Sequence, residues 1–196
     1  MIDRKKFFNI VKLRLHGGTL KQPQVNGYTF LLDAWEQGYA GTYPTQYLAY
    51  ALATAFHETA ETMMPIHEYG AISYFDKYDT GKMATVLGNT PAKDGDGYLW
   101  RGRGYVQLTG KRNYLYASSA LKLPVIVANP DSATDPHIAA QIMFSGMING
   151  WFTGKKLKDY NLPTGFQKVN ARRIINGTDK AAKIAGHYDD YTAALA

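Results

Sequence analysis

Two carboxylates, Glu58 and Glu68, are the residues of this sequence best suited to acid–base chemistry. Glu58 follows an apolar run that reads as a helix, so its carboxyl group would be partly shielded from water and would favour its protonated form. Glu68 lies beyond Pro65, which directs the chain away from that helix. Such a pair can hydrolyse a glycosidic bond, because one carboxyl protonates the leaving oxygen while the other activates a water or attacks directly. The spacing alone leaves two competitors open in the same stretch, Asp76 and Asp79.

The surroundings of Glu58 do not favour a metal site. A zinc protease helix would carry His-Glu-x-x-His, whereas the fifth position of that pattern, counted from His57, is occupied by Glu61. The chain has no cysteine, which excludes disulfides and cysteine-ligated metals. We therefore expect neither a metal nor a cofactor.

A glycine-rich segment is the third candidate, with the sequence Arg101-Gly102-Arg103-Gly104-Tyr105-Val106-Gln107-Leu108-Thr109-Gly110. Its glycines would let a ligand approach the backbone closely. Gln107 and Thr109 offer polar side chains, of which one could orient a water and the other could hold a sugar amide. A turn that leads into a strand is the structural alternative. A nucleotide-binding loop is disfavoured, because the third glycine of that motif and a clear preceding strand are missing.

Several short motifs follow one another in a fixed order along the chain. They are His57-Glu58-Thr59, Glu68-Tyr69-Gly70, Gly88-Asn89-Thr90, Asp94-Gly95-Asp96-Gly97, Arg101-Gly102-Arg103-Gly104, Gln107-Leu108-Thr109, Asn113-Tyr114 and Ile174-Ile175-Asn176-Gly177. This ordered set resembles the family 19 glycoside hydrolases, the plant-type chitinases, and is most similar to the branch found in bacteriophage endolysins. The resemblance covers the chain from Leu48 to Leu195.

The resemblance implies a mainly α-helical, lysozyme-like fold with two lobes, long loops and a deep substrate cleft. It implies an inverting mechanism without metal. In that mechanism Glu58 is the general acid, Glu68 is the general base, and Thr109 helps to position the attacking water. An inverting pair must leave room for that water, so the carboxyl groups are expected ~6.5–9.5 Å apart or slightly more.

The remaining predicted site residues are expected to bind substrate. They are Gln107, Asn113, Asn176, Tyr105 and Arg103. Two departures from the family pattern stand out. The base of the plant enzymes lies further along the chain from the acid than Glu68 does from Glu58, and Thr178 replaces a second glycine after Asn-Gly.

The elements that must position these residues are expected to be mostly helical. Apolar spacing and capping residues predict helices over residues 3–15, 45–64, 113–121, 136–152, 169–175 and 179–195, with a further apolar segment over 28–35. Residues 65–104 read as irregular, residues 105–108 as a short strand or a helix start, and residues 154–163 as a loop. We expect one catalytic domain over residues 1–196. It would have an N-terminal helical part (1–40), a catalytic core (45–196) and no separate wall-binding domain.

Composition and charge limit the classes of partner that this chain is expected to bind. The chain has 196 residues, 45% of them apolar, which suits a folded protein with one sizeable core. Its net charge of +6 favours an anionic partner such as cell wall. The basic residues are dispersed and form no recognised motif, so nucleic acid is not expected. No apolar run reaches the length of a signal peptide core or a membrane helix.

These observations predict an endolysin that hydrolyses the β-1,4-glycosidic bonds of peptidoglycan and causes bacterial lysis. We expect a monomer without stable membrane insertion, which starts in the host cytoplasm and reaches the cell wall through another factor. Two alternatives remain at this stage. One is a chitinase that acts on chitin oligosaccharides, since both polymers share a β-1,4 backbone of N-acetylated sugars. The other is a non-catalytic glycan-binding virion protein.

Overall fold

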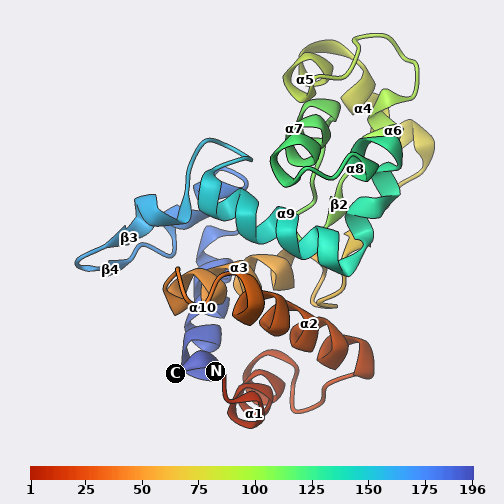
Figure 1. Cartoon of the computed structure of the whole chain (residues 1–196). Coiled ribbons are helices and arrows are strands. Elements are labelled where there is room, and N and C mark those ends of the chain that lie inside the picture. The colour runs from red at the N-terminus through yellow and green to blue at the C-terminus, as the bar shows by residue number, and fades with distance from the viewer. The chain divides into compact units, whose positions relative to one another are not determined.

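The computed structural model describes all 196 residues and divides into two compact units. The terminal unit comprises residues 1–64 and 143–196, and the middle unit comprises residues 65–142. Helices dominate the chain, and each of its strands is only two residues long. This confirms the predicted mainly α-helical fold class (Figure 1). None of the helices combines the length and the apolar character that a membrane-spanning segment requires.

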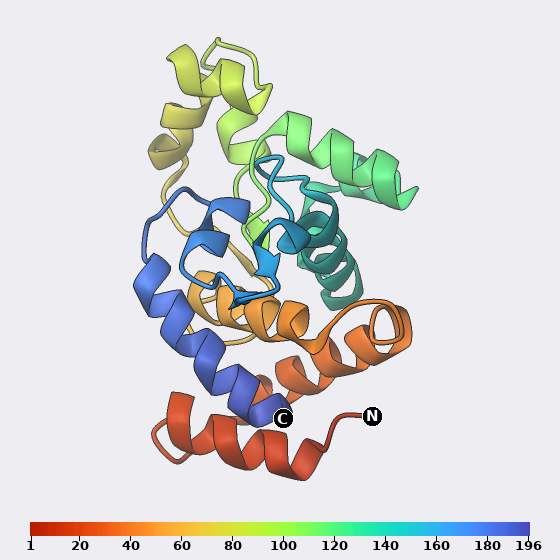
Figure 2. The ribbon, with the colours of Figure 1, turned by 90° about the vertical axis from the view of Figure 1, so that its left-hand side faces the viewer.

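Long helices form most of the terminal unit. They are α1 (Arg4–Leu15), α2 (Gln22–Gly38), α3 (Thr45–Glu58), α10 (Ala181–Leu195) and the last part of α9 (Pro136–Asn149). The central helix is α3, whose residues 47–56 are all buried, which explains why that stretch is apolar on every face. Helix α10 packs along both α3 and α1 (Figure 2). Glu58 is the last residue of α3, so the core of this unit fixes the helix that carries it.

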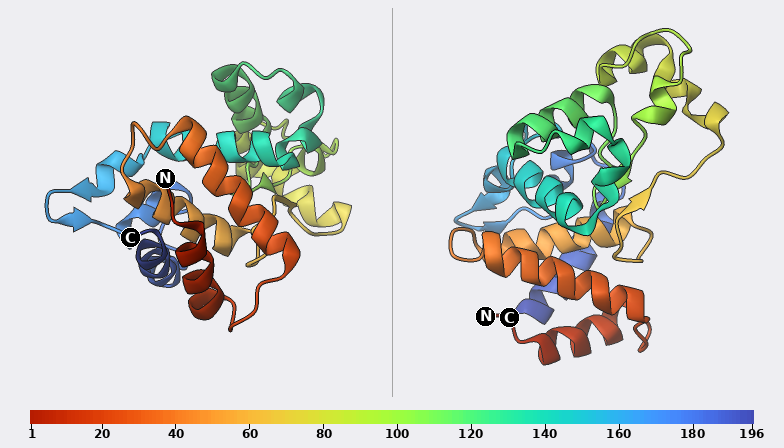
Figure 3. Two further views of the ribbon diagram at one scale, coloured as in Figure 1. Left: turned by 60° about the horizontal axis from the view of Figure 1, so that its bottom comes forward. Right: turned by 45° about the vertical axis from the view of Figure 1, so that its right-hand side comes forward.

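Short elements complete the terminal unit. They are η3 (Leu157–Tyr160), β3 (Asn161–Leu162), β4 (Gly165–Phe166) and η4 (Asn170–Ile174), where η denotes a 3-10 helix. Strands β3 and β4 form an antiparallel hairpin that projects from this unit (Figure 3). The ring of Phe166 stacks on Tyr188 of α10 at a centroid distance of 5.1 Å and so anchors the base of the hairpin.

The middle unit holds several short elements, some of them in residues 65–104, which the sequence suggested were irregular. They are β1 (Ile66–His67), η1 (Ile72–Phe75), α4 (Asp76–Asp79), α5 (Gly81–Leu87), α6 (Asp96–Leu99), β2 (Arg103–Gly104), α7 (Lys111–Leu121), α8 (Val125–Ala128) and η2 (Pro130–Thr134). Strand β1 pairs antiparallel with β2, with Ile66 opposite Gly104. The pairing continues one step further, because Glu68 N donates to Gly102 O at 2.7 Å. Glu68 is thereby placed beside the glycine-rich segment.

A buried carboxylate, Asp79, organises the loop between α5 and α6. It accepts hydrogen bonds from the backbone amides of Gly95 and Gly97. The side chain of Asn89 donates to Tyr78 O and accepts from Lys111 N, at 3.0 Å each. Asp79 is therefore a structural anchor and not a competitor of Glu58 or Glu68.

Several segments differ from the predictions, among them residues 154–163, which the sequence predicts as a loop but which contain η3 and β3. Helix α3 ends at Glu58 instead of continuing to about residue 64, because Ala60 and Glu61 adopt left-handed backbone angles that end the helix. Residues 105–108 are a turn, not a strand or a helix start. Reciprocal hydrogen bonds between the backbones of Arg103 and Leu108 close this turn.

Three half-buried histidines of the terminal unit are expected to make its stability depend on pH. Burial is the main cause that lowers the pKa of His16, His57 and His187 below the usual value. The unfolded chain therefore takes up these protons near pH 6.5, before the folded chain does. The free energy of unfolding should fall as the pH is lowered from 7.5 to 5.0.

Thermal denaturation at these two pH values tests this. His187 packs edge-on against Phe56 at 4.9 Å, so His187→Phe keeps an aromatic ring there and should weaken the pH dependence. Equal melting temperatures of the wild type at pH 7.5 and 5.0 would contradict the prediction.

Candidate active site

In the terminal unit, Glu58 is held by an arginine that follows 114 residues later in the chain. Arg172 lies in η4, its side chain is 2% exposed, and its Nη1 donates to Glu58 Oε1 at 2.6 Å. Its Nε donates to Asp179 O at 2.9 Å, which fixes the guanidinium plane. The Glu58 side chain is 17% exposed, so its carboxyl group still reaches solvent. This is a carboxyl group of defined orientation at the end of a rigid helix.

Asn176 is the other predicted site residue of the terminal unit. Its backbone N donates to Arg172 O at 3.0 Å, and the residue is exposed directly after η4. The structure therefore connects Asn176 with Glu58 through Arg172. Its exposed amide is free to meet a polar ligand from solvent.

In the middle unit, Glu68 receives hydrogen bonds on both carboxylate oxygens. Tyr78 Oη donates to Oε1 at 2.9 Å, and Gly102 N donates to Oε2 at 3.1 Å. The ammonium of Lys77 lies 3.8 Å from Oε1 and 3.5 Å from the centroid of the Tyr74 ring. Burial, followed by the charge of Glu68, raises the pKa of Tyr78 to about 12, so the hydroxyl stays protonated and remains a donor. These donors hold both oxygens of the Glu68 carboxylate in a fixed orientation beside Gly102.

Three predicted site residues converge around Gly102. A Cβ built on Gly102 would lie 2.8 Å from Gln107 Oε1, 3.1 Å from Glu68 Oε2 and 3.2 Å from Thr109 Oγ1. The absence of a side chain at position 102 is thus what lets three polar groups share one small space. The structure brings together the predicted base, the predicted water-positioning residue and a predicted sugar-binding residue.

The hydrogen bonds of these residues leave acceptor atoms open. Thr109 Oγ1 donates to Gln107 O at 2.8 Å, so its oxygen can accept from a water or a ligand. Gln107 Nε2 donates to Ile66 O and Gly104 O, which leaves Oε1 as an acceptor beside Gly102. Asn113 Nδ2 donates to Thr109 O at 2.7 Å and steadies this segment from α7.

The side chains of Arg103 and Tyr105 are buried among other groups of the protein and present no exposed surface to a substrate. The Arg103 side chain is 2% exposed, with Nε 2.8 Å from Asp131 Oδ1, and Nη1 donates to Leu99 O and Arg101 O. Tyr105 is 1% exposed. We correct the prediction for both residues, because neither side chain is accessible to a sugar.

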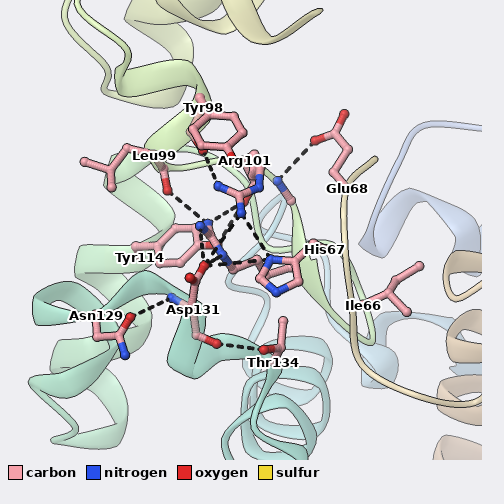
Figure 4. Close-up of polar contacts among 12 residues, drawn as sticks. Ile66, His67, Glu68, Tyr98, Leu99, Arg101, Tyr114, Asn129, Asp131 and Thr134 are labelled. Carbon is pink, nitrogen blue, oxygen red and sulfur yellow. Dashed lines mark hydrogen bonds and ion pairs between the residues drawn. The ribbon is translucent and has the colours of Figure 1, made fainter. Parts of the chain in front are cut away.

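The cluster around Asp131 explains what Arg103 does. Burial acts against ionisation of Asp131, but the hydrogen bond and charge of Arg103, with the charges of His67 and Arg101, outweigh it and lower the pKa of Asp131. Figure 4 shows His67 and Arg101 beside Asp131 with the Glu68 side chain apart from them, and Gly102 N donates to Glu68 Oε2. The cluster therefore supports the backbone that binds Glu68 and leaves Glu68 itself outside the ion-pair network.

The sequence reasoning missed Arg172 and Tyr78. Arg172 is one of two adjacent arginines in residues 169–175, where Asn170 is also polar, so the sequence does not distinguish it from the exposed Arg173. Tyr78 lies ten residues after Glu68 among several tyrosines, and nothing in the sequence distinguishes it from its neighbours.

Comparison with known proteins gives a fold. No family model matches the chain. The chain is similar to the crystal structure of chitinase C from Streptomyces griseus HUT6037, with a TM-score of 0.64 and 19% identity over 99% of this chain and 76% of that one. It is similar to a glutamate-to-glutamine variant of chitinase C, with a TM-score of 0.58 and 21% identity over 99% and 92% of the two chains. It is also similar to the crystal structure of a bacterial family 19 chitinase, with a TM-score of 0.57 and 18% identity over 99% of this chain and 94% of that one. These likenesses confirm the predicted lysozyme-like fold of the family 19 chitinases.

Proposed function

We propose that this protein hydrolyses β-1,4-glycosidic bonds of peptidoglycan by an inverting acid–base mechanism and acts as an endolysin. The observation that carries the proposal is the convergence of Glu68, Gln107 and Thr109 around Gly102 in a chain with the fold of the family 19 chitinases. We propose further that residues 1–196 work as one catalytic module. Glycan hydrolysis is the part of the proposal that this fold supports directly.

In the proposed mechanism Glu58 is the general acid. Arg172 occupies Oε1, so the other carboxylate oxygen, Oε2, would carry the proton that is passed to the leaving glycosidic oxygen. The Arg172 contact also fixes the rotamer of Glu58, which keeps that oxygen in a constant direction. A proton donor of constant direction is what the departing oxygen requires.

Glu68 is the proposed general base. Its carboxylate would remove a proton from a water that attacks the anomeric carbon, and Thr109 Oγ1 would accept the second hydrogen of that water. Gln107 Oε1 is suited to accept from the N–H of an N-acetyl group, because its own amide nitrogen already donates to backbone carbonyls. Asn113 and Asn176 are proposed to contact further sugars of the chain.

Charge supports peptidoglycan as the substrate. The net charge of +6 would draw the protein toward an anionic wall polymer, whereas chitin carries no negative charge. The resemblance of the ordered motifs to the phage endolysin branch favours the same substrate. Chitin hydrolysis is the second candidate, and it is favoured by the similar solved structures, which are chitinases.

The test compares the two polymers directly. Purified peptidoglycan and chitin oligosaccharides are incubated with the protein, and the released reducing ends are identified by mass spectrometry. We expect release from peptidoglycan, faster than from chitin, with the α-anomer appearing first by NMR because the mechanism inverts. Release from chitin alone would favour the second candidate, and release from neither would reject hydrolysis.

Adding a single methyl group at Gly102 is expected to impair the proposed base. Gly102→Ala would place a carbon among Gln107 Oε1, Glu68 Oε2 and Thr109 Oγ1, and would displace them from their shared space. Displacements on the order of 1 Å cost roughly 100-fold in rate, so we expect kcat/KM to fall by about 10–100-fold. The measurement is the initial rate of reducing-end release.

Gly186→Ala is the matched control for this substitution. A Cβ at Gly186, in α10, would meet no atom within 4 Å, so its rate should equal that of the wild type. Wild-type kinetics in a folded Gly102→Ala variant would contradict the role given to this group of residues.

A further inference from the structure

The turn that follows Glu58 has an unfavourable backbone conformation. Ala60, Glu61 and Met63 have φ angles of 50°, 68° and 57°, in the left-handed region that residues with a Cβ rarely adopt. Three such residues within four positions require surrounding contacts that hold them there. These contacts identify what holds the end of α3 in place.

Contacts within the turn lead back to the last turn of α3. Glu61 N donates to Phe56 O at 2.8 Å, and Met63 N donates to the hydroxyl of Thr59 at 3.1 Å. The same hydroxyl donates to Ala55 O at 2.8 Å. The path of the turn and the orientation of the helix end that carries Glu58 are therefore set together.

Contacts from α2 hold the turn from outside. Gln24 Nε2 donates to Glu61 O at 3.0 Å. A Cβ built on Gly27 would overlap the carbonyl oxygen of Met63, so only glycine lets the turn come this close to α2. The Met63 side chain is fully buried, and its sulfur lies 3.9 Å from the hydroxyl of Tyr191 in α10.

From these contacts we infer that α2 is a positioning element for the catalytic acid, with Gly27 and Gln24 as positioning residues that act on Glu58 through the turn at residues 59–63. The inference rests on the proposed role of Glu58 and extends it to the N-terminal part of the chain. Neither residue would touch substrate. Their effect would be to fix the direction of the Glu58 carboxyl group.

The first test is Gly27→Ala against Gly38→Ala, two glycines of the same helix. A Cβ at Gly38 would meet no atom within 4 Å, whereas at Gly27 it would push Met63 and the turn outward. We expect kcat of Gly27→Ala to fall by about 10–100-fold with KM nearly unchanged, because acid placement is altered and sugar binding is not. The acid-dependent limb of its pH–rate profile should shift, and Gly38→Ala should match the wild type in both respects.

A second pair keeps the inference testable if Gly27→Ala does not fold. Gln24→Leu removes the hydrogen bond to Glu61 O together with the contacts to Lys21 N and His16 Nδ1, and Gln22→Leu on the same helix removes only an exposed bond to Asn26. We expect a lower kcat and faster amide hydrogen exchange at residues 59–63 for Gln24→Leu alone. A folded Gln24→Leu or Gly27→Ala variant with wild-type kcat would overturn the inference while leaving the proposed function intact. A wild type that cleaves neither glycan would overturn both.

Discussion

Glu58→Gln is expected to slow glycan hydrolysis by orders of magnitude and to leave the fold nearly unchanged. Glutamine has the size of glutamate, and its amide oxygen can still accept the hydrogen bond from Arg172. It cannot release a proton to the leaving oxygen. General acid catalysis contributes typically 10²–10⁴-fold, so we expect kcat to fall by about that factor. Reducing-end release and the melting temperature are measured on the same preparation.

A matched control separates loss of the acid from loss of a carboxylate in general. Glu36→Gln removes a carboxylate of α2 that pairs with Arg4 at 2.6 Å, outside the candidate site. It should keep the wild-type kcat. Full hydrolysis by a folded Glu58→Gln variant would show that another group protonates the leaving oxygen, and the assignment of Glu58 would have to be abandoned.

Local sequence signals predicted the helices well where residues next to a helix determine its beginning or its end. Helix α1 begins at a cap, since Asp3 accepts from Lys6 N, and it ends just before Gly17. Helix α9 begins at Pro136 as expected, with Asp135 accepting from the first turn. The end of α3 was missed because the left-handed turn after Glu58 is held by Gln24 and Gly27 of α2, which lie more than 30 residues earlier in the chain. Contacts between residues so far apart in the chain leave no periodic pattern in the sequence.

Prediction of the candidate site was limited in the same way. Gln107 and Thr109 could be identified because they lie in one short motif with Gly102, and the structure gathers them with Glu68. Arg103 lies in the same motif, yet it turns inward to Asp131. An arginine between two glycines looks the same in sequence whether it faces a ligand or a buried carboxylate. The tertiary neighbours decide which way the arginine side chain points, and here that neighbour, Asp131, lies 28 residues away in the sequence.

Removing the partner of Glu58 is expected to cost substantial stability. Arg172→Met keeps the apolar stem but leaves the Glu58 carboxylate without its guanidinium and Asp179 O without a donor. Breaking a buried ion pair from one side typically costs 3–5 kcal/mol. Glu58 is 17% exposed and can be partly rehydrated, so we expect the free energy of unfolding to fall by about 3 kcal/mol, the lower end of that range. Urea denaturation measures this as a lower midpoint with an unchanged slope.

The double variant Arg172→Met with Glu58→Gln distinguishes an unpaired charge from a loss of packing. If the carboxylate left behind causes the loss, neutralising it should return about 1–2 kcal/mol, and the double variant should be more stable than Arg172→Met alone. The neighbouring Arg173 is exposed, so Arg173→Met should leave stability unchanged within about 0.5 kcal/mol. A double variant no more stable than Arg172→Met would mean that Arg172 stabilises η4 through its own packing and through Asp179 O. In that case its contact with Glu58 would orient the acid without stabilising the fold.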